Sequence, residues 1–145
     1  LASDFYSIGL AHKHLPEMQK LAGLDSAPVF VPILGDIRQG MMTSVMLQNK
    51  LLSGTPTAQD ICEMLSSYYE GQEMVRVLPF GGETPRLATS ALAGKDYLTI
   101  TVSGHTDQTL LTAQFDNLGK GASGAAVQNM NIMLGFPEST GLNID

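Results

Sequence analysis

The stretch YLTITVSGHTDQTLLTAQF, residues 97–115, decides the fold of this chain. Its first six residues alternate between apolar and polar side chains, which is the pattern of a strand with one buried face. Residues 104–107 are typical of a turn, and residues 108–115 form a second strand-like run. The stretch therefore predicts an antiparallel hairpin, with His105 exposed at its tip.

Helix and strand signals on both sides of this hairpin complete the predicted fold. Proline is accepted in the first turn of a helix, so Pro16 marks the start of a first helix. Pro28 and Pro32 demote the run 27–33 to an edge strand, which we expect to form a hairpin with residues 40–48. The predicted helices span residues 16–23, 57–71 and 121–133, and the further predicted strands span residues 4–8, 27–33, 40–48, 74–78 and 87–92. These elements predict an α+β domain with about three helices packed on one mixed, mostly antiparallel sheet.

The second predicted helix carries its own start signal. Thr57 can cap the helix, and Asp60 three residues later completes a capping box. The apolar stripe of this helix consists of Ile61, Met64, Leu65 and Tyr68. Cys62 lies off the centre of that stripe, and no basic side chain stands beside it to favour a thiolate. We therefore interpret Cys62 as a half-buried small residue and not as a nucleophile.

Composition limits the classes of function. The chain has 145 residues, enough for one domain with its own core, and its 43% hydrophobic and 15% charged content is that of a globular protein. The net charge is -6 and the eight Lys and Arg residues are scattered, so we expect no nucleic-acid partner. The longest apolar run, residues 27–34, is far shorter than the roughly twenty residues of a membrane-spanning helix, so we expect no membrane partner.

Cysteine content and the amino terminus bear on location. A single cysteine excludes an internal disulfide framework and suits a reducing compartment, and no secretory signal is readable at the amino terminus. We therefore expect a cytoplasmic protein. No initiator methionine precedes Leu1, and strand-like residues follow soon after, so we expect the chain to be a piece of a longer protein. No metal site is predicted.

Two of the three histidines lie in the stretch His12-Lys13-His14-Leu15-Pro16-Glu17, at the start of the first predicted helix. Chain reversal there can bring the Glu17 carboxylate back to an upstream imidazole, holding one ring nitrogen and leaving the other free to exchange protons. The functional interpretation is a positioned proton carrier. The structural alternative is a polar helix start, in which Glu17 interacts favourably with the helix dipole. The residues alone leave both interpretations open.

A glycine-rich stretch precedes the last predicted helix. Gly119-Lys120-Gly121-Ala122-Ser123-Gly124 matches the G-x-G-x-x-G pattern of dinucleotide-binding turns. A Rossmann unit would also need a second parallel strand, but residues 125–145 are filled by the helix and a tail. As a helix start with free amides, Gly121 can approach an anion closely; alternatively, the small residues let the helix pack tightly.

Residues 12–17 and residues 115–131 (FDNLGKGASGAAVQNMN) together carry a resemblance to a known family. The chain resembles the carboxy-terminal part of N-acetyl-gamma-glutamyl-phosphate reductases, arginine-biosynthesis enzymes related to aspartate-semialdehyde dehydrogenase. The segments 38–41 (RQGM) and 135–138 (GFPE) extend the likeness over nearly the whole chain. The resemblance implies the fold of a glyceraldehyde-3-phosphate dehydrogenase-like C-terminal domain.

The resemblance also implies a reaction. The family reduces an acyl phosphate, N-acetyl-glutamyl 5-phosphate, to its semialdehyde with NADPH as cofactor. A cysteine thiolate attacks the acyl phosphate, phosphate leaves, hydride reduces the thioester, and a histidine handles protons. The matching positions imply His12 as the acid/base, Glu17 as its orienting carboxylate, Arg38 as a substrate contact and Asn117 as a residue beside the nicotinamide. As the helix start described above, Gly121 is expected to be a second cofactor contact. A homo-oligomer is implied as well.

Departures from the family pattern qualify this reading. The family's nucleophile lies in a Gly-Cys-x-Pro-Thr segment, which this chain lacks, and Cys62 does not match it. The amino-terminal Rossmann domain, which would bind most of the NADP, is missing too. The resemblance implies that residues 1–118 are a substrate-binding and dimerisation domain and that residues 119–145 are a return helix and tail that would pack on the missing domain.

Two functional hypotheses follow. In the first, the chain belongs to the reductase and is inactive alone, because no thioester can form without the thiolate. In the second, it is a non-catalytic interaction or regulatory domain on the same scaffold. The eight methionines would suit the buried interface that the second hypothesis requires.

Overall fold

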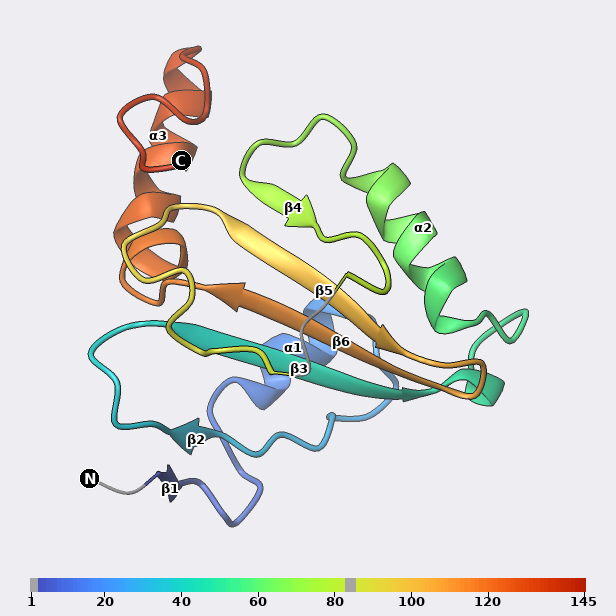
Figure 1. Ribbon diagram of the computed structural model, residues 1–145. Coiled ribbons are helices and arrows are strands. Elements are labelled where there is room, and N and C mark those ends of the chain that lie inside the picture. The colour runs from blue at the N-terminus through green and yellow to red at the C-terminus, as the bar shows by residue number, and fades with distance from the viewer. Residues whose placement is uncertain (1–2, 83–85) are drawn as a thin grey trace. The chain divides into compact units, whose positions relative to one another are not determined.

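The chain forms two compact units, Leu1–Arg38 and Gln39–Asp145. A computed structural model describes residues 3–82 and 86–145 of it (Figure 1). The boundary between the units falls directly after Arg38, one of the predicted site residues.

The first unit contains helix α1 (Leu15–Leu21) and a two-stranded sheet of β1 (Asp4–Phe5) and β2 (Ile33–Leu34). Pro16 lies in the first turn of α1, which confirms the helix predicted there. The hairpin predicted between residues 27–33 and 40–48 is wrong, because β2 pairs antiparallel with β1. Prolines lack the N–H that a strand needs for its ladder, and the proline-containing run accordingly contributes only its end to a strand.

The second unit is built on a four-stranded sheet in the order β3-β6-β5-β4 (Figure 1). Strands β5 and β6 pair antiparallel, β3 pairs antiparallel with β6, and β4 runs parallel to β5. The strands are β3 (Met41–Gln48), β4 (Val75–Val77), β5 (Leu98–Gly104) and β6 (Gln108–Phe115). The predicted hairpin and the predicted mixed, mostly antiparallel sheet are both confirmed.

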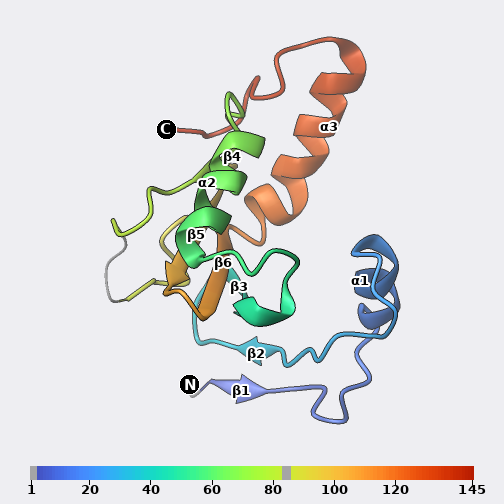
Figure 2. The same cartoon turned by 90° about the vertical axis from the view of Figure 1, so that its right-hand side faces the viewer.

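Helix α2 (Ala58–Tyr68) covers one face of this sheet beside β4 and β5 (Figure 2). Its buried residues pack with the sheet in a single cluster consisting of Ala58, Ile61, Cys62 and Val102. The half-buried position predicted for Cys62 is wrong, because the side chain is only 3% exposed and its thiol donates to the backbone oxygen of Leu78 at 3.5 Å. The face of α2 that packs on the sheet therefore includes Cys62. Met64 and Tyr68, which were predicted to belong to the apolar stripe, are 57% and 75% exposed.

The start of α2 follows the predicted capping box. The Asp60 N–H donates to Thr57 Oγ1 at 3.2 Å, and the Thr57 N–H donates to an Asp60 carboxylate oxygen at 2.8 Å. The Thr57 hydroxyl also donates to the Asp60 carboxylate at 2.7 Å, and this bond, together with the one from the Thr57 N–H, lowers the pKa of the Asp60 carboxyl. The helix therefore begins where the sequence predicts.

The strand predicted over residues 87–92 is wrong, because this segment forms consecutive turns. The Ala91 N–H donates to Ala88 O, the Ala93 N–H to Ser90 O and the Lys95 N–H to Leu92 O. These local bonds satisfy the backbone without a partner strand, and the small alanines offer little surface for packing on a sheet.

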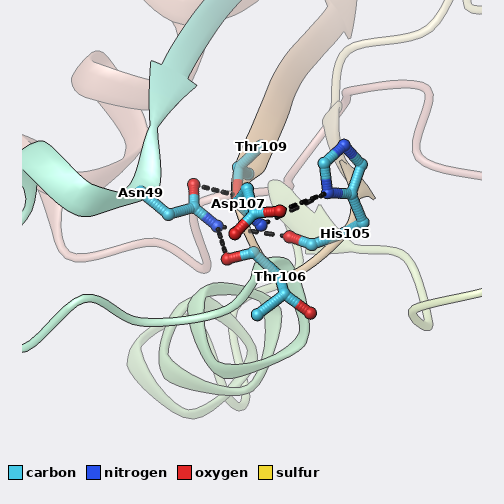
Figure 3. Close-up of polar contacts among 5 residues, drawn as sticks. All are labelled: Asn49, His105, Thr106, Asp107 and Thr109. Atoms are coloured by element: carbon cyan, nitrogen blue, oxygen red, sulfur yellow. Dashed lines mark hydrogen bonds and ion pairs between the residues drawn. The ribbon is translucent and has the colours of Figure 1, made fainter.

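A buried asparagine holds the tip of the β5–β6 hairpin (Figure 3). Asn49 begins the short 3-10 helix η1 (Asn49–Leu51) and is 1% exposed. Its amide nitrogen donates to the backbone oxygens of His105 and Thr106, at 3.2 and 3.0 Å, and its Oδ1 accepts from the Thr109 hydroxyl at 2.9 Å. His105 itself is exposed at the tip, as predicted.

The glycine-rich segment continues into the last helix. It forms a π-helix, η2 (Gly119–Ser123), that leads into α3 (Gly124–Leu134), and α3 extends beyond the end of the sheet (Figures 1 and 2). Gly135 ends α3 in a left-handed conformation with φ 76°, as the predicted stop requires. Large apolar side chains on and after α3 are exposed, namely Met130, Ile132, Met133, Leu134 and Phe136. Within the described residues, no helix is long and apolar enough to cross a membrane.

Candidate functional site

His12 lies in the loop before α1, and three aromatic rings hold its imidazole. The ring centroids of Tyr6, His14 and Phe30 lie 5.7, 4.8 and 5.1 Å from that of His12, all edge-on. The backbone N–H of His14 donates to His12 Nδ1 at 3.2 Å. A nitrogen that accepts a hydrogen bond carries no proton, so the neutral ring holds its proton on Nε2. Because His12 is half-buried, the imidazole is neither sealed in the core nor fully in solvent.

Glu17 and Arg38 are the other two predicted site residues of the first unit. Glu17 is exposed in the first turn of α1. In the part of the chain that the structure describes, the partner of His12 Nδ1 is the His14 backbone and not Glu17. Arg38 is exposed at the end of the unit. The orienting role of Glu17 and the substrate contact of Arg38 stay predictions.

Asn117 in the second unit directly follows β6 and ties down the residues that precede β3. Its Oδ1 accepts the backbone N–H of Gly40 at 2.8 Å. Gly40 has φ 122°, and a Cβ there would lie 2.8 Å from Ser90 Cα, so only glycine fits. Because the bond to Gly40 uses only its oxygen, the exposed Asn117 side chain can still offer its NH₂ group as a donor.

Asp116, the residue before, was not predicted and is fully buried, at 0% exposure. Its Oδ1 accepts the backbone N–H groups of Leu118 and Gly119, at 2.8 and 3.1 Å. Its Oδ2 accepts the backbone N–H of Gly94 and the side-chain amide of Gln39. Burial alone would raise the pKa of this carboxyl, but the four hydrogen bonds outweigh it and lower the pKa to about 2. Asp116 is therefore an ionised carboxylate at neutral pH.

The interior of the segment 119–124 is filled by the chain itself. A Cβ at Gly119 would lie 2.9 Å from the Asp96 carboxylate, and a Cβ at Gly124 would collide with the same carboxylate. A carboxylate in this position repels phosphate, so the tight-packing alternative explains Gly119 and Gly124. Gly121 is exposed, and its cofactor contact stays a prediction.

Lys120 turns towards α3. Its ammonium donates to the Gln128 side-chain oxygen, and the Gln128 amide nitrogen donates to a Glu138 carboxylate oxygen at 2.7 Å. Partial burial lowers the pKa of Lys120, and the carboxylates of Glu138 and Asp96 act in the opposite direction. Lys120, the one cation of the glycine-rich segment, is therefore hydrogen-bonded to a residue of α3.

The model of the semialdehyde dehydrogenase dimerisation domain family matches residues 2–117, which is most of the chain. The chain therefore belongs to this family.

Particular relatives are N-acetyl-gamma-glutamyl-phosphate reductases. The chain is 42% identical to N-acetyl-gamma-glutamyl-phosphate reductase 2 of Nostoc sp., in a match that covers 94% of this chain and 45% of the relative. It is 44% identical to N-acetyl-gamma-glutamyl-phosphate reductase 2 of Pseudomonas putida, over 97% of this chain and 46% of the relative. With N-acetyl-gamma-glutamyl-phosphate reductase of Brucella ovis the identity is 46%, over 92% and 45%. The chain thus spans less than half the length of these relatives.

Proposed function

We propose that this chain is the carboxy-terminal part of a cytoplasmic, NADP-dependent oxidoreductase of arginine biosynthesis. The enzyme reduces N-acetyl-glutamyl 5-phosphate to N-acetyl-glutamate 5-semialdehyde and releases phosphate. The observation that carries the proposal is the name shared by relatives that are 42–46% identical over nearly the whole chain. The family's cysteine chemistry needs an accessible thiolate, and the buried Cys62 cannot supply it. The chain alone is therefore inactive.

His12 is the acid/base of the proposed reaction. Its Nδ1 is engaged by the His14 backbone, so proton exchange with a substrate takes place at Nε2. The edge-on rings around the imidazole limit its rotation and keep Nε2 in one direction. In this proposal Arg38 grips a carboxylate or phosphate of the substrate with two parallel hydrogen bonds.

The described residues fit only one end of the coenzyme. NADPH supplies the hydride when it is bound. The exposed NH₂ group of Asn117 fits the carboxamide of a nicotinamide, with Gly121 as a close backbone contact. The phosphates do not fit segment 119–124, where the Asp96 carboxylate fills the space beside Gly119 and Gly124. In this proposal the phosphates are bound by a further domain, against which residues 119–145 and the exposed apolar side chains of α3 pack.

Replacement of His12 in the full-length reductase tests the proposal. We expect His12→Ala to lower turnover by roughly two to four powers of ten, which is the usual contribution of a general acid/base. His105→Ala is the matched control, because His105 is an exposed histidine at a hairpin tip, and it should leave turnover unchanged. Steady-state rates with the acyl phosphate and NADPH provide the measurement. Turnover like that of the wild type in His12→Ala would remove His12 from the mechanism.

Strand β3 favours a second part of the proposal, self-association. It is one of the two edge strands of the described four-stranded sheet, and Val45 and Met46 on opposite faces are 50% and 83% exposed. Exposed apolar side chains along an edge strand suit a subunit interface, so we propose a homo-oligomer. The alternative function, a non-catalytic interaction domain, is supported by the same exposed apolar side chains of β3. A full-length protein that associates but does not reduce the acyl phosphate would establish that alternative.

A further inference from the structure

Strand β3 is an edge strand without the features that usually protect one. Soluble proteins place charges, prolines, bulges or very short strands at the edges of a sheet, so that other chains cannot pair there. The residues Met41–Gln48 include no charge and no proline, and their pairing with β6 is continuous from end to end. The opposite edge is protected, because β4 has only three residues and includes Arg76, whose guanidinium carbon lies 3.8 Å from the centroid of the Tyr97 ring.

The register of the sheet shows which backbone groups of β3 point outwards. Hydrogen-bonded and non-hydrogen-bonded residue pairs alternate along an antiparallel ladder. The Asn49 N–H donates to Asp107 O at 2.9 Å, directly beyond the last residue pair of β3 and β6. Every second residue before Asn49 therefore directs its N–H and C=O groups towards β6. The residues between them, Met42, Ser44 and Met46, direct theirs out of the edge of the sheet.

These outward groups match those of a second copy of the same strand. When two β3 strands run antiparallel about a two-fold axis at Ser44, Met42 faces the partner's Met46 and Ser44 faces the partner's Ser44. Methionine then meets methionine, hydroxyl meets hydroxyl, and no like charges face each other. With the axis at Val45, by contrast, Ser44 would face methionine and Met42 would face Gln48. The sequence of β3 therefore favours the axis at Ser44.

The Ser44 hydroxyl belongs to a polar row that crosses the sheet. Ser44 Oγ and Thr112 Oγ1 lie 3.1 Å apart, and Thr101 lies opposite Thr112 in β5. A hydroxyl donates once and accepts twice, so Ser44 can also bond to the partner's Ser44. Met42 and Met46 flank this row on the same side of the sheet and are 39% and 83% exposed. Self-pairing would extend the row into the second copy and cover both methionines.

We propose that two copies of this protein pair through β3, antiparallel about a two-fold axis at Ser44, so that their four-stranded sheets join into one continuous sheet. This inference rests on the homo-oligomer of the proposed function and specifies how the copies meet. A two-fold contact of this kind is closed, because it uses the unprotected edge of each copy once. Association through this edge therefore stops at the dimer.

Disulfide cross-linking in the full-length reductase tests the pairing. Opposite residues of a hydrogen-bonded antiparallel pair have Cα atoms about 5.5 Å apart, which a disulfide spans. Ser44→Cys should therefore give mostly cross-linked dimer on oxidation with copper phenanthroline, and peptide mass spectrometry should locate the bond at position 44 of both copies. Val45→Cys is the matched control, because Val45 is the next residue and is 50% exposed. Its Cα atoms would lie roughly 8 Å apart across the axis, too far for a disulfide.

A proline variant provides a second readout. An edge strand tolerates proline where the N–H points out of the sheet, so Ser44→Pro should keep the pairing of β3 with β6. It removes one outward donor from each copy, and we expect the Kd of the dimer to rise by about 10- to 100-fold in sedimentation velocity. If Ser44→Pro does not fold, cross-linking decides alone.

The outcomes separate this pairing from the proposed function. A dimeric wild type in which Ser44→Cys cross-links no more than Val45→Cys would overturn the pairing and leave the homo-oligomer standing. The same holds for a folded Ser44→Pro variant with unchanged Kd. A monomeric wild type would contradict the pairing and the homo-oligomer together. A dimer that cross-links through Ser44→Cys but does not reduce the acyl phosphate would support the pairing and contradict only the reductase activity.

Discussion

Single buried polar side chains organise the second unit. Asn49 and Asp116 are both almost fully buried, and each hydrogen-bonds to loop residues that lie outside the strands. The capping pair Thr57 and Asp60 could be predicted because its partners are three positions apart. Asp116 could not, because its donors Gln39 and Gly94 lie 77 and 22 positions away. Only the fold brings those donors together, although the carboxylate stands beside a residue that the family resemblance singled out.

The lowered pKa of Asp116 predicts a pH dependence of stability. Its folded pKa of about 2 lies below the ordinary 3.8, so its contribution to stability is fully present above the unfolded value and is lost as the pH falls towards 2. We expect the difference in free energy of unfolding between wild type and Asp116→Asn to be constant from pH 7 to about 5 and to shrink below it. Urea titrations of this chain at several pH values measure it. A difference that stays constant down to pH 2.5 would contradict the ionised carboxylate.

At the scale of elements, local sequence patterns predicted the helices and strands correctly where the interacting segments are close in sequence. The hairpin of β5 and β6 was predicted because alternation and turn lie within one stretch, and α2 and α3 were predicted from their start and stop signals. The pairing of residues 27–33 was wrong because the true partner, β1, lies far upstream. The strand predicted at 87–92 was wrong because backbone turns satisfied the segment locally. Partner choice between distant segments depends on packing that no local window contains.

Segment 119–124 yields a prediction at this scale. A Cβ at Gly124 would collide with the Asp96 carboxylate and lie 2.8 Å from the Gly119 backbone, neither of which can move freely. We expect Gly124→Ala to lower the free energy of unfolding by about 1–3 kcal/mol, as overpacking does. Gly82→Ala is the control, because its Cβ would make only an ordinary contact of 3.4 Å. Urea unfolding curves measure both, and equal stability of the two variants would contradict the tight-packing explanation.

At the scale of the whole molecule, the chain consists of two units, and its predicted site residues are divided between them. His12, Glu17 and Arg38 belong to the first unit, and Asn117 and Gly121 to the second. The chain matches a dimerisation-domain family over residues 2–117 and spans less than half the length of its relatives, and its one thiol, Cys62, is buried. Sequence motifs singled out these five residues, but their assignment to two units required the fold.

Self-association is the prediction that belongs to this scale. We expect the chain to sediment as a dimer or larger species at micromolar concentration, and Met46→Glu to shift it towards the monomer by placing a charge on the apolar edge strand. Met64→Glu is the control, since Met64 is an exposed methionine on α2. Sedimentation velocity measures all three. A monomeric wild type would contradict the homo-oligomer, and an unchanged Met46→Glu would exclude β3 from the interface.

The pairing of β3 with β6 has a consequence for synthesis of the protein. Met41 faces Phe115 and Gln48 faces Gln108, so the first strand of the sheet to be translated needs the last one. A nascent chain at the ribosome cannot complete the pairing of Met41–Gln48 until residue 115 has left the exit tunnel. During that interval the edge-strand methionines are open to other chains, and the loop that finally closes is long, which makes this docking step slow.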